Sequence, residues 1–366
     1  MYFHQHKEWP NFTWDNRVLL PRISAVRDLQ GRLIGRMESM GFELRDEAAL
    51  VTITEDVVKS SEIEGEFLNP KEVRSSVARR LGMEISGLPA VSRDVEGIVE
   101  MMMDATQNYN DPLSKSRLCD WHAALFPTGR SGMHKITVAD WRKDGTGPMQ
   151  VVSGPMGREK VHYTAPEASR VETEMTAFLN WFNGNDGLEP VMKSAIAHLW
   201  FVSIHPFDDG NGRIARAIAD CQLARADRTN QRFYSISAQL MKSKKEYYDT
   251  LESTQKGDMD ITQWLLWYFD RLTDALTATN ETLSKILAKA RFWEEHKNTQ
   301  FNERQLVMVN KLQDDFFGKL TSSKWAKMTK VHRDTALRDI QDLVRKGVLE
   351  DSGEGGRSTN YVLVEE

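Results

Sequence analysis

The sequence predicts a mainly α-helical protein that carries two short β-hairpins. Apolar residues recur at helical spacing through most of the 366 residues. Residues 191–204 are apolar nearly all round, which is typical of a helix at the centre of a bundle. Only residues 141–163 and 348–363 combine short apolar runs with glycine turns in the manner of a hairpin.

The composition is that of an ordinary soluble protein, with 40% hydrophobic and 28% charged residues. A net charge of −5 argues against a chain built wholly for nucleic acid or an anionic membrane, and leaves a local basic patch open. No apolar run approaches the roughly 20 residues of a transmembrane helix, and the first residues lack the pattern of a signal peptide. Cys119 and Cys221 lie in helical contexts and predict buried free thiols in a reducing compartment. We therefore expect a cytoplasmic protein without a membrane partner.

The first predicted domain covers residues 1–85 and is helical. An aromatic-rich opening leads into one helix, and a second helix begins near Glu47. Gly65 is expected to cap the second helix, and Asn69 to start the next element. Composition alone makes the end of the second helix a solvated acidic surface, formed by Glu62, Glu64 and Glu66.

The second predicted domain covers residues 86–295, which read as helical, then irregular, then helical again. Within residues 141–163 two short strands flank a glycine turn. His122 and His198 lie on apolar helix faces and are expected to be core histidines. The aromatic stripe of residues 261–295 is expected to be core as well. The strands of the hairpin hold Val151, Val152, Val161 and His162.

The third predicted domain covers residues 300–366 and follows a linker at 296–302. Three helices and a hairpin resemble a winged helix-turn-helix. Between positions 319 and 346 there are eight Lys and Arg against three Asp, which permits phosphate contacts on the third helix and at Arg357 in the wing. DNA binding and a protein-interaction or dimerisation role both stay open. The helices are expected at 304–312, 322–328 and 332–346, and the hairpin at 348–363.

The chemically richest stretch follows the central apolar helix and opens with His205. Gly210 and Gly212 allow a tight turn and a close approach of the backbone to a ligand. The residues after the turn form a strong helix, so the turn lies at a helix N-terminus, where free N–H groups and the helix dipole bind anions. Arg213 and Arg216 share a helix face beside that anion. The stretch therefore predicts a phosphate-binding turn with a base at its edge.

The pattern His-Pro-Phe-x-Asp-Gly-Asn-Gly-Arg-x-x-Arg resembles the complete signature of the Fic-domain family. The resemblance implies a Fic helical-bundle core with a short β-hairpin flap. It makes His205 the general base, and Asp209 the holder of Mg²⁺, with Mn²⁺ as the alternative. It also implies that Asn211 helps to form an anion hole for the α-phosphate, and that Arg213 and Arg216 hold the outer phosphates of ATP. The resemblance further implies that Phe207 anchors the loop in the core and that the backbone at Gly210 and Gly212 contacts the nucleotide.

A second motif lies ahead of the core. Ser60, Glu64 and Gly65 match the pattern (Ser/Thr)-x-x-x-Glu-(Gly/Asn), which resembles the inhibitory motif of Fic proteins that block their own site. A carboxylate paired with Arg216 would occupy the arginine that otherwise binds the γ-phosphate of ATP. It would also place a negative charge where that phosphate binds. The resemblance therefore implies a self-inhibited protein.

The resemblance also implies an adenine pocket and a docking surface. Tyr248 is expected to pack on the adenine, and Gln255 stands where several members of the family have asparagine. The hairpin of residues 141–163 corresponds to the family's flap, which aligns an extended target segment by main-chain pairing and supplies register more than side-chain selectivity.

The implied activity is transfer of AMP from ATP to a Ser, Thr or Tyr hydroxyl of a target protein, and to the chain itself. Three alternatives stay open: removal of AMP with Glu64 positioning a water, transfer of another phosphate-containing group, and a DNA-binding regulator whose core senses nucleotide. The identity of the target and the oligomeric state, a homodimer included, are left open by the sequence.

Overall fold

The computed structural model describes residues 2–83, 89–143, 145, 147–155, 157–185, 187–313, 316, 318–353 and 359–364. Helices dominate and the strands are short, which confirms the predicted mainly α class. The chain divides into two compact units, Met1–Glu281 and Thr282–Glu366. The division falls inside the last long helix, Thr262–Glu295.

The first unit holds ten α-helices within the described residues and begins an eleventh. Its elements are the 3₁₀-helix η1 (Phe3–Gln5), α1 (Asn16–Glu38), α2 (Phe42–Ile63), α3 (Pro70–Arg80), α4 (Arg93–Gln107), α5 (Lys115–Leu125), β1 (Arg130–Ser131), β2 (His134–Lys135), β3 (Gln150–Ser153), β4 (Lys160–Thr164), α6 (Ala168–Asn183), α7 (Pro190–Ile204), α8 (Asn211–Asp227), α9 (Ile236–Lys242), α10 (Lys244–Gln255) and the start of α11 (Thr262–Glu295).

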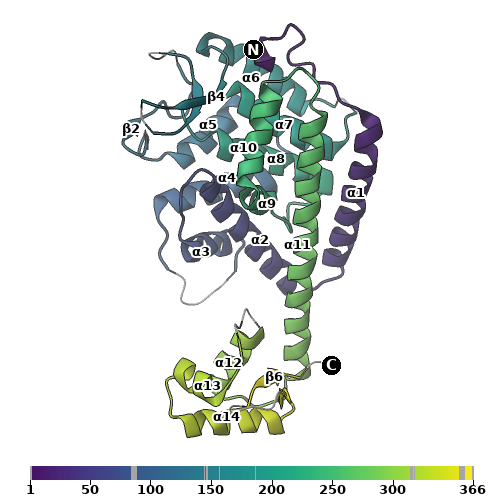
Figure 1. Ribbon diagram of the computed structural model, residues 1–366, viewed down its shortest axis with the longest axis vertical. Coiled ribbons are helices and arrows are strands. Elements are labelled where there is room, and N and C mark those ends of the chain that lie inside the picture. The colour runs from purple at the N-terminus through teal and green to yellow at the C-terminus, as the bar shows by residue number, and fades with distance from the viewer. Residues whose placement is uncertain are drawn as a thin grey trace. The chain divides into compact units, whose positions relative to one another are not determined.

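Helices α7 and α8 form the centre of this unit (Figure 1). Nearly every residue of both helices is buried, as the apolar run at 191–204 predicts. Pro190 occupies the first turn of α7, and the Glu189 side chain accepts hydrogen bonds from the N–H groups of Val191 and Met192. Helix α7 is therefore capped at its N-terminal end.

Helix α2 packs against α3, α9 and α8, so its C-terminal end lies against the helix that follows the glycine turn. The helix starts at Phe42, five residues before the predicted start at Glu47. Helix α8 starts at Asn211, inside the glycine motif rather than after it. Both differences have one reason, which is that packing against neighbouring helices extends a helix beyond its strongest propensity signal.

The predicted hairpin of residues 141–163 is present as β3 and β4. The strands are antiparallel, with Val151 opposite Tyr163, Val152 opposite Val161, and a bulge between Val151 and Val152. The sequence did not predict the smaller β1–β2 pair, whose two-residue strands are too short for a periodic pattern.

The second unit holds α12 (Glu303–Gln313), α13 (Ser322–Thr329), α14 (Arg333–Arg345) and the antiparallel strands β5 (Leu349–Asp351) and β6 (Tyr361–Leu363). Helix α11 ends at Glu295, just before the predicted linker at 296–302. The predicted three helices and hairpin are therefore present, and Arg357 lies outside the described residues. The core of this unit is formed by Met308, Val309, Leu320, Trp325, Ala336, Ile340, Leu343, Val348 and Leu349.

Among the described residues, no helix combines the length and the apolar character needed to cross a membrane.

Candidate functional site

The site is built on the turn between α7 and α8. The turn needs two residues in the left-handed region, His205 (φ 53°) at the end of α7 and Gly210 (φ 81°) just before α8. The Phe207 N–H donates to Asn211 Oδ1 at 3.0 Å, and Asn211 Nδ2 donates to the Phe207 carbonyl at 2.8 Å. The Phe207 ring is fully buried and stacks on His122 with 4.2 Å between ring centroids. The turn is thus fixed at its middle by one amide and one ring.

The Asn211 side chain is bonded to the backbone within the turn. Its amide is 2% exposed and makes both hydrogen bonds to the backbone of Phe207. Its backbone N–H belongs to the first turn of α8, where N–H groups have no partner within the helix. An anion at this helix start would therefore meet backbone groups, while the Asn211 side chain holds the turn in shape.

His205 has the geometry of a neutral base. Its Nδ1 lies 3.1 Å from the Val202 carbonyl, which can only accept a hydrogen bond. Nδ1 therefore carries the proton, and the lone pair is on Nε2. Burial lowers the pKa of His205 below its usual value, so the ring stays neutral near pH 7. Arg142 fixes the backbone here, since its Nε donates to the His205 carbonyl at 2.7 Å.

The two glycines of the turn are required for different reasons. A Cβ on Gly210 would lie 2.9 Å from a ring carbon of Phe126, and its φ of 81° also disfavours other residues. A Cβ on Gly212 would lie 2.2 Å from Glu64 Oε1. The Glu64 carboxylate therefore lies directly against the backbone at the start of α8, where a phosphate oxygen would bind.

Arg216 is fully buried and is held from α2. Its Nη2 donates to Glu64 Oε1 at 2.7 Å and to the Ser60 carbonyl at 2.8 Å, and its Nε donates to Ser60 Oγ at 2.9 Å. Burial lowers the pKa of Arg216, but the surrounding groups, the Glu64 carboxylate first among them, together raise it above its usual value. Ser60, Glu64 and Arg216 are thus brought together, as the motif predicts.

The end of α2 points Glu64 toward α8 through a glycine cap. Gly65 has φ 84°, its N–H donates to the Glu62 carbonyl at 3.0 Å, and the Glu66 N–H donates to the Ser61 carbonyl at 3.1 Å. These two bonds form a Schellman motif with Gly65 in the left-handed position, as the sequence predicts. The chain reverses there, so Glu66 returns to the same site.

Arg213 has a carboxylate partner of its own. Its Nη1 donates to Glu66 Oε2 at 2.5 Å, and its guanidinium lies 5.1 Å from the centre of the Phe126 ring. A cavity of about 440 Å³ opens beside this pair and is lined by Glu66, Phe126 and Arg213 among others. Within the described residues, Arg213 Nε and Arg216 Nη1 are buried without a hydrogen-bond partner. Buried donors left unpaired are expected where a ligand binds.

Asp209 lies in the turn next to Asp208, and its side chain is 44% exposed. Its Oδ1 accepts from the Gly210 N–H, and its Oδ2 accepts from the Ser131 hydroxyl. No group of three or more His, Cys, Asp or Glu that could hold a metal is found among the described residues. Mg²⁺ is commonly held by one or two carboxylates together with substrate phosphates, and Asp209 fits that arrangement.

The two residues expected at the adenine lie on α10. Tyr248 is 38% exposed, and its hydroxyl donates to the Ile63 carbonyl of α2 at 3.3 Å. Gln255 is buried, and its Nε2 donates to Ser203 Oγ of α7 at 3.0 Å. Tyr248 therefore lies next to Glu64, while the Gln255 amide is occupied within the core.

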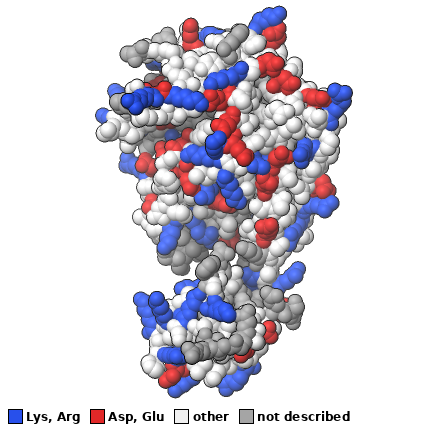
Figure 2. Space-filling model, viewed as in Figure 1, with Lys and Arg blue, Asp and Glu red and all other residues white. Residues whose placement is uncertain are grey.

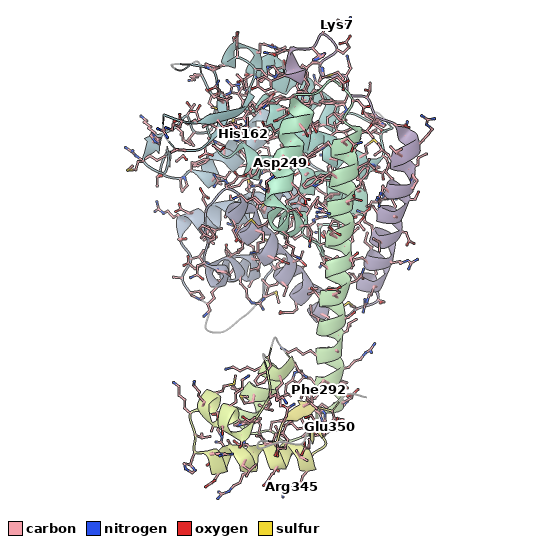
Figure 3. All side chains as sticks on the ribbon, viewed as in Figure 1. Lys7, His162, Asp249, Phe292, Arg345 and Glu350 are labelled. Carbon is pink, nitrogen blue, oxygen red and sulfur yellow. The ribbon has the colours of Figure 1, made fainter. Side chains whose placement is uncertain are left out.

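The β3–β4 hairpin presents apolar side chains and is tied to α10. Val152 is 48% exposed and Val161 is 37% exposed. His162 Nδ1 lies 2.5 Å from Glu252 Oε2 of α10, and Figure 3 shows His162 beside that helix. Hydrogen bonds from Lys256 and His162 lower the pKa of Glu252 to about 2, so this carboxylate stays charged.

Sequence reasoning missed four residues of the site: Glu66, Phe126, Ser131 and Arg142. Composition predicts that Glu66 is part of a solvated helix end, and only the chain reversal at Gly65 brings it to Arg213. The other three lie far from the glycine motif in sequence and carry no pattern of their own. His122 and His198 are buried and bonded within the core, as predicted, and burial lowers the pKa of His122 to about 4.

The fold and this geometry define a class: a helical domain with an anion-binding turn between two buried helices, covered by a carboxylate of the same chain. Comparison with known proteins agrees. The family model described as Fic/DOC family matches residues 112–223, and the one described as a domain of unknown function, DUF4172, matches residues 2–83. The chain therefore contains a Fic/DOC-family domain.

Named relatives match part of the chain. It is 32% identical over 99 residues to the protein adenylyltransferase Fic of Nematostella vectensis and 31% identical over 114 residues to that of Culex quinquefasciatus. These matches cover 26% and 30% of this chain, and 22% of the length of each relative.

Solved structures share the fold over more of the chain. A Fic family protein from Desulfovibrio desulfuricans aligns over 94% of this chain and 97% of its own, with a TM-score of 0.54 and 21% identity. A Fic domain containing signalling protein from Bacteroides thetaiotaomicron aligns over 74% and 98%, with a TM-score of 0.52 and 19% identity.

Proposed function

We propose that the protein is an adenylyltransferase that transfers AMP from ATP to a Ser, Thr or Tyr hydroxyl of a target protein and of the chain itself. The observation that carries the proposal is the junction of α7 and α8. A neutral base, a helix N-terminus and two arginines with unpaired buried donors converge on one glycine turn. The names of the Nematostella and Culex relatives support the same activity.

In the proposed reaction, His205 Nε2 takes the proton of the target hydroxyl as its oxygen attacks the α-phosphorus of ATP. The bond between the α-phosphorus and the bridging oxygen breaks, and pyrophosphate leaves with the electron pair. The backbone N–H groups at the start of α8 stabilise the charge on the α-phosphate oxygens. Arg213 and Arg216 bind the outer phosphates, which fixes the α-phosphate near His205.

Asp209 would hold Mg²⁺, or Mn²⁺ in its place, with the phosphates of ATP supplying further oxygens. The ion would neutralise charge on the departing pyrophosphate. Tyr248 is positioned to contact the adenine, because its half-exposed ring lies on α10 close to the end of α2. Gln255 would act indirectly, since its amide is bonded to Ser203.

Glu64 keeps this site inactive in the proposal. It occupies Arg216 and lies against Gly212, so a nucleotide with its phosphates in the productive position meets a carboxylate at both points. The hairpin formed by β3 and β4 would align the target, because Val152 and Val161 are exposed on it and its link to α10 holds it close to the nucleotide.

Removal of AMP is a second candidate, favoured by the position of Glu64 against the start of α8. A carboxylate at that point could orient a water for attack on the α-phosphorus. The two reactions differ in their response to Glu64, because transfer is inhibited by this residue and removal depends on it.

The test compares the wild type, Glu64→Gly and His205→Ala/Glu64→Gly after incubation with α-labelled ATP and Mg²⁺, with label counted on protein. We expect weak labelling of the wild type, strong labelling of Glu64→Gly and none of the double variant. Equal labelling of Glu64→Gly and the wild type would show that Glu64 does not inhibit. Absence of label on every variant and in a cell extract would favour removal of AMP or nucleotide sensing.

A further inference from the structure

The unit Thr282–Glu366 contains a helix-turn-helix that the proposed transfer reaction does not use. Helices α13 and α14 are joined by residues 330–332, and Lys330 makes the turn in the left-handed region with φ 55°. Trp325 of α13 and Ile340 of α14 are both fully buried in the core of the unit. The angle between the two helices is therefore fixed by packing.

Helix α14 is amphipathic and presents one polar face. Its buried positions are Ala336, Asp339, Ile340 and Leu343. Four exposed positions, 334, 338, 341 and 345, follow one another at spacings of four, three and four residues. This spacing places them along one stripe of the helix. This exposed stripe is formed by Asp334, Arg338, Gln341 and Arg345. In Figure 3, Arg345 lies at the outer side of α14, away from Phe292, a partly buried residue that packs against the core of the unit.

Two of the three carboxylates counted between positions 319 and 346 are paired within the unit. Asp339 is bound to Arg304 at 2.7 Å, and Asp342 is bound to Lys346 at 2.5 Å. Both carboxylates are thereby neutralised within the unit. Within the described residues, Lys327 and Lys330 are exposed and make no ion pair. Figure 2 shows Lys and Arg side chains spread over the visible face of this unit, with few carboxylates between them.

From this arrangement we propose that the unit binds double-stranded DNA, with α14 in the major groove. An α-helix fits that groove, and α14 is about 20 Å long at 1.5 Å per residue over its residues Arg333–Arg345. Arg338 and Gln341 project from the exposed stripe, and these two residue types make paired hydrogen bonds to guanine and adenine respectively. They are the base-reading residues.

The phosphate contacts come from the turn and its surroundings. Lys327 in the last turn of α13, Lys330 in the turn and Arg333 at the start of α14 lie where the first helix of such a motif crosses the DNA backbone. The Arg333 Nε donates to Ser322 Oγ at 3.2 Å, which holds the guanidinium at the turn rather than on the exposed stripe.

The same face is poorly suited to a membrane surface. A membrane-binding helix pairs its basic residues with a stripe of Trp, Phe or Leu that enters the lipid. The large apolar side chain exposed on α14 is Val344, at 39%, while Trp325 is fully buried. Duplex DNA is therefore the partner that fits this surface.

The test uses the full chain and a fluorescent duplex of mixed sequence, about 20 base pairs or two helical turns long. With three phosphate contacts, a plot of the logarithm of the binding constant against the logarithm of the salt concentration should have a slope of about −3. The affinity should therefore fall about 40-fold between 50 and 200 mM salt. The variant Lys327→Ala/Lys330→Ala should reduce this slope to about −1, so its affinity should fall only about 4-fold over the same range of salt. Arg338→Ala/Gln341→Ala should keep the slope and abolish any sequence preference selected from a random pool.

The matched control is Lys7→Ala/Arg17→Ala, which removes two cations whose side chains are 90% and 91% exposed in the other unit. This control should keep the slope of the wild type. The proposal is overturned if the duplex does not bind at 50 mM salt, if the control lowers the slope as much as Lys327→Ala/Lys330→Ala, or if vesicles of anionic lipid bind more tightly than the duplex. Labelling with ATP should be the same for all four proteins, which separates this result from the proposed transfer.

Discussion

Two carboxylates, Glu64 and Glu66, are paired with the two arginines of the site. Replacing each one with alanine measures how much that carboxylate weakens the binding of ATP. Each variant removes one negative charge from the place where a nucleotide phosphate would bind. The buried arginine then lacks a counter-charge until ATP arrives, so both variants should bind ATP more tightly than the wild type. The two effects should differ in size because the two pairs differ in exposure.

The ion pair between Glu64 and Arg216 should be stronger than the one between Glu66 and Arg213. Arg216 is fully buried, Glu64 is 30% exposed, and the bond between them is 2.7 Å. A hydrogen bond to a charged group contributes about 1.5–3 kcal/mol, which corresponds to an increase in ATP affinity of about 10- to 150-fold on its removal. The Glu66 side chain is 48% exposed, and its pair with Arg213 borders the cavity. An ion pair of that kind contributes about 0.2–1 kcal/mol, or about 1.4- to 5-fold.

Titration calorimetry with a non-hydrolysable ATP analogue and Mg²⁺ measures both values. Glu62→Ala is the matched control, because Glu62 lies on the same helix end but pairs with Lys59 at 2.6 Å and contacts neither arginine. Its affinity for the analogue should equal that of the wild type. The reasoning is refuted if Glu66→Ala strengthens binding as much as Glu64→Ala, or if Glu64→Ala changes the affinity less than 2-fold.

Three further outcomes are expected. Because burial lowers the pKa of His205 below 6.5, AMP transfer by an activated variant should persist as the pH falls to 6.5 and be lost only below it; an acid midpoint above 6.5 in the pH–rate profile would exclude His205 as the base. Phe207→Ala should lower the free energy of unfolding by about 3–5 kcal/mol in urea, since its ring is fully buried and stacked on His122; a loss under 1 kcal/mol would show that the ring does not hold the turn. His162→Ala should reduce transfer to a target several-fold while the affinity for ATP stays the same, because it removes the link between the hairpin and Glu252; equal losses in both would assign His162 to the nucleotide site.

The helices were predictable because their signals are local. The apolar run at 191–204, the glycine cap at Gly65 and the periodic pattern of the last three helices each follow from residues a few positions apart. The sequence predicts that this helix begins after the glycine turn, whereas α8 begins at Asn211 within it, because a glycine and an asparagine are weak helix formers in isolation.

The site was predictable only where its residues form a motif. The glycine turn and the pairing of Glu64 with Arg216 follow from two short patterns, 152 positions apart along the chain. The contact between Glu66 and Arg213 and the bond from Arg142 to His205 depend on how distant helices pack, which no local pattern encodes. The Asn211 amide shows the same limit, because its two bonds to Phe207 are visible only once the turn is folded.

The most direct test of the proposed reaction follows the position of the label in ATP. Glu64→Gly is incubated with Mg²⁺ and ATP labelled either at the α-phosphate or at the γ-phosphate, and protein-bound label is measured for each. Attack on the α-phosphorus with His205 as the base predicts label on protein from the α-position alone, with the γ-label released as pyrophosphate. Label on protein from the γ-position would contradict the account, because it would mean that the site transfers a phosphate rather than AMP.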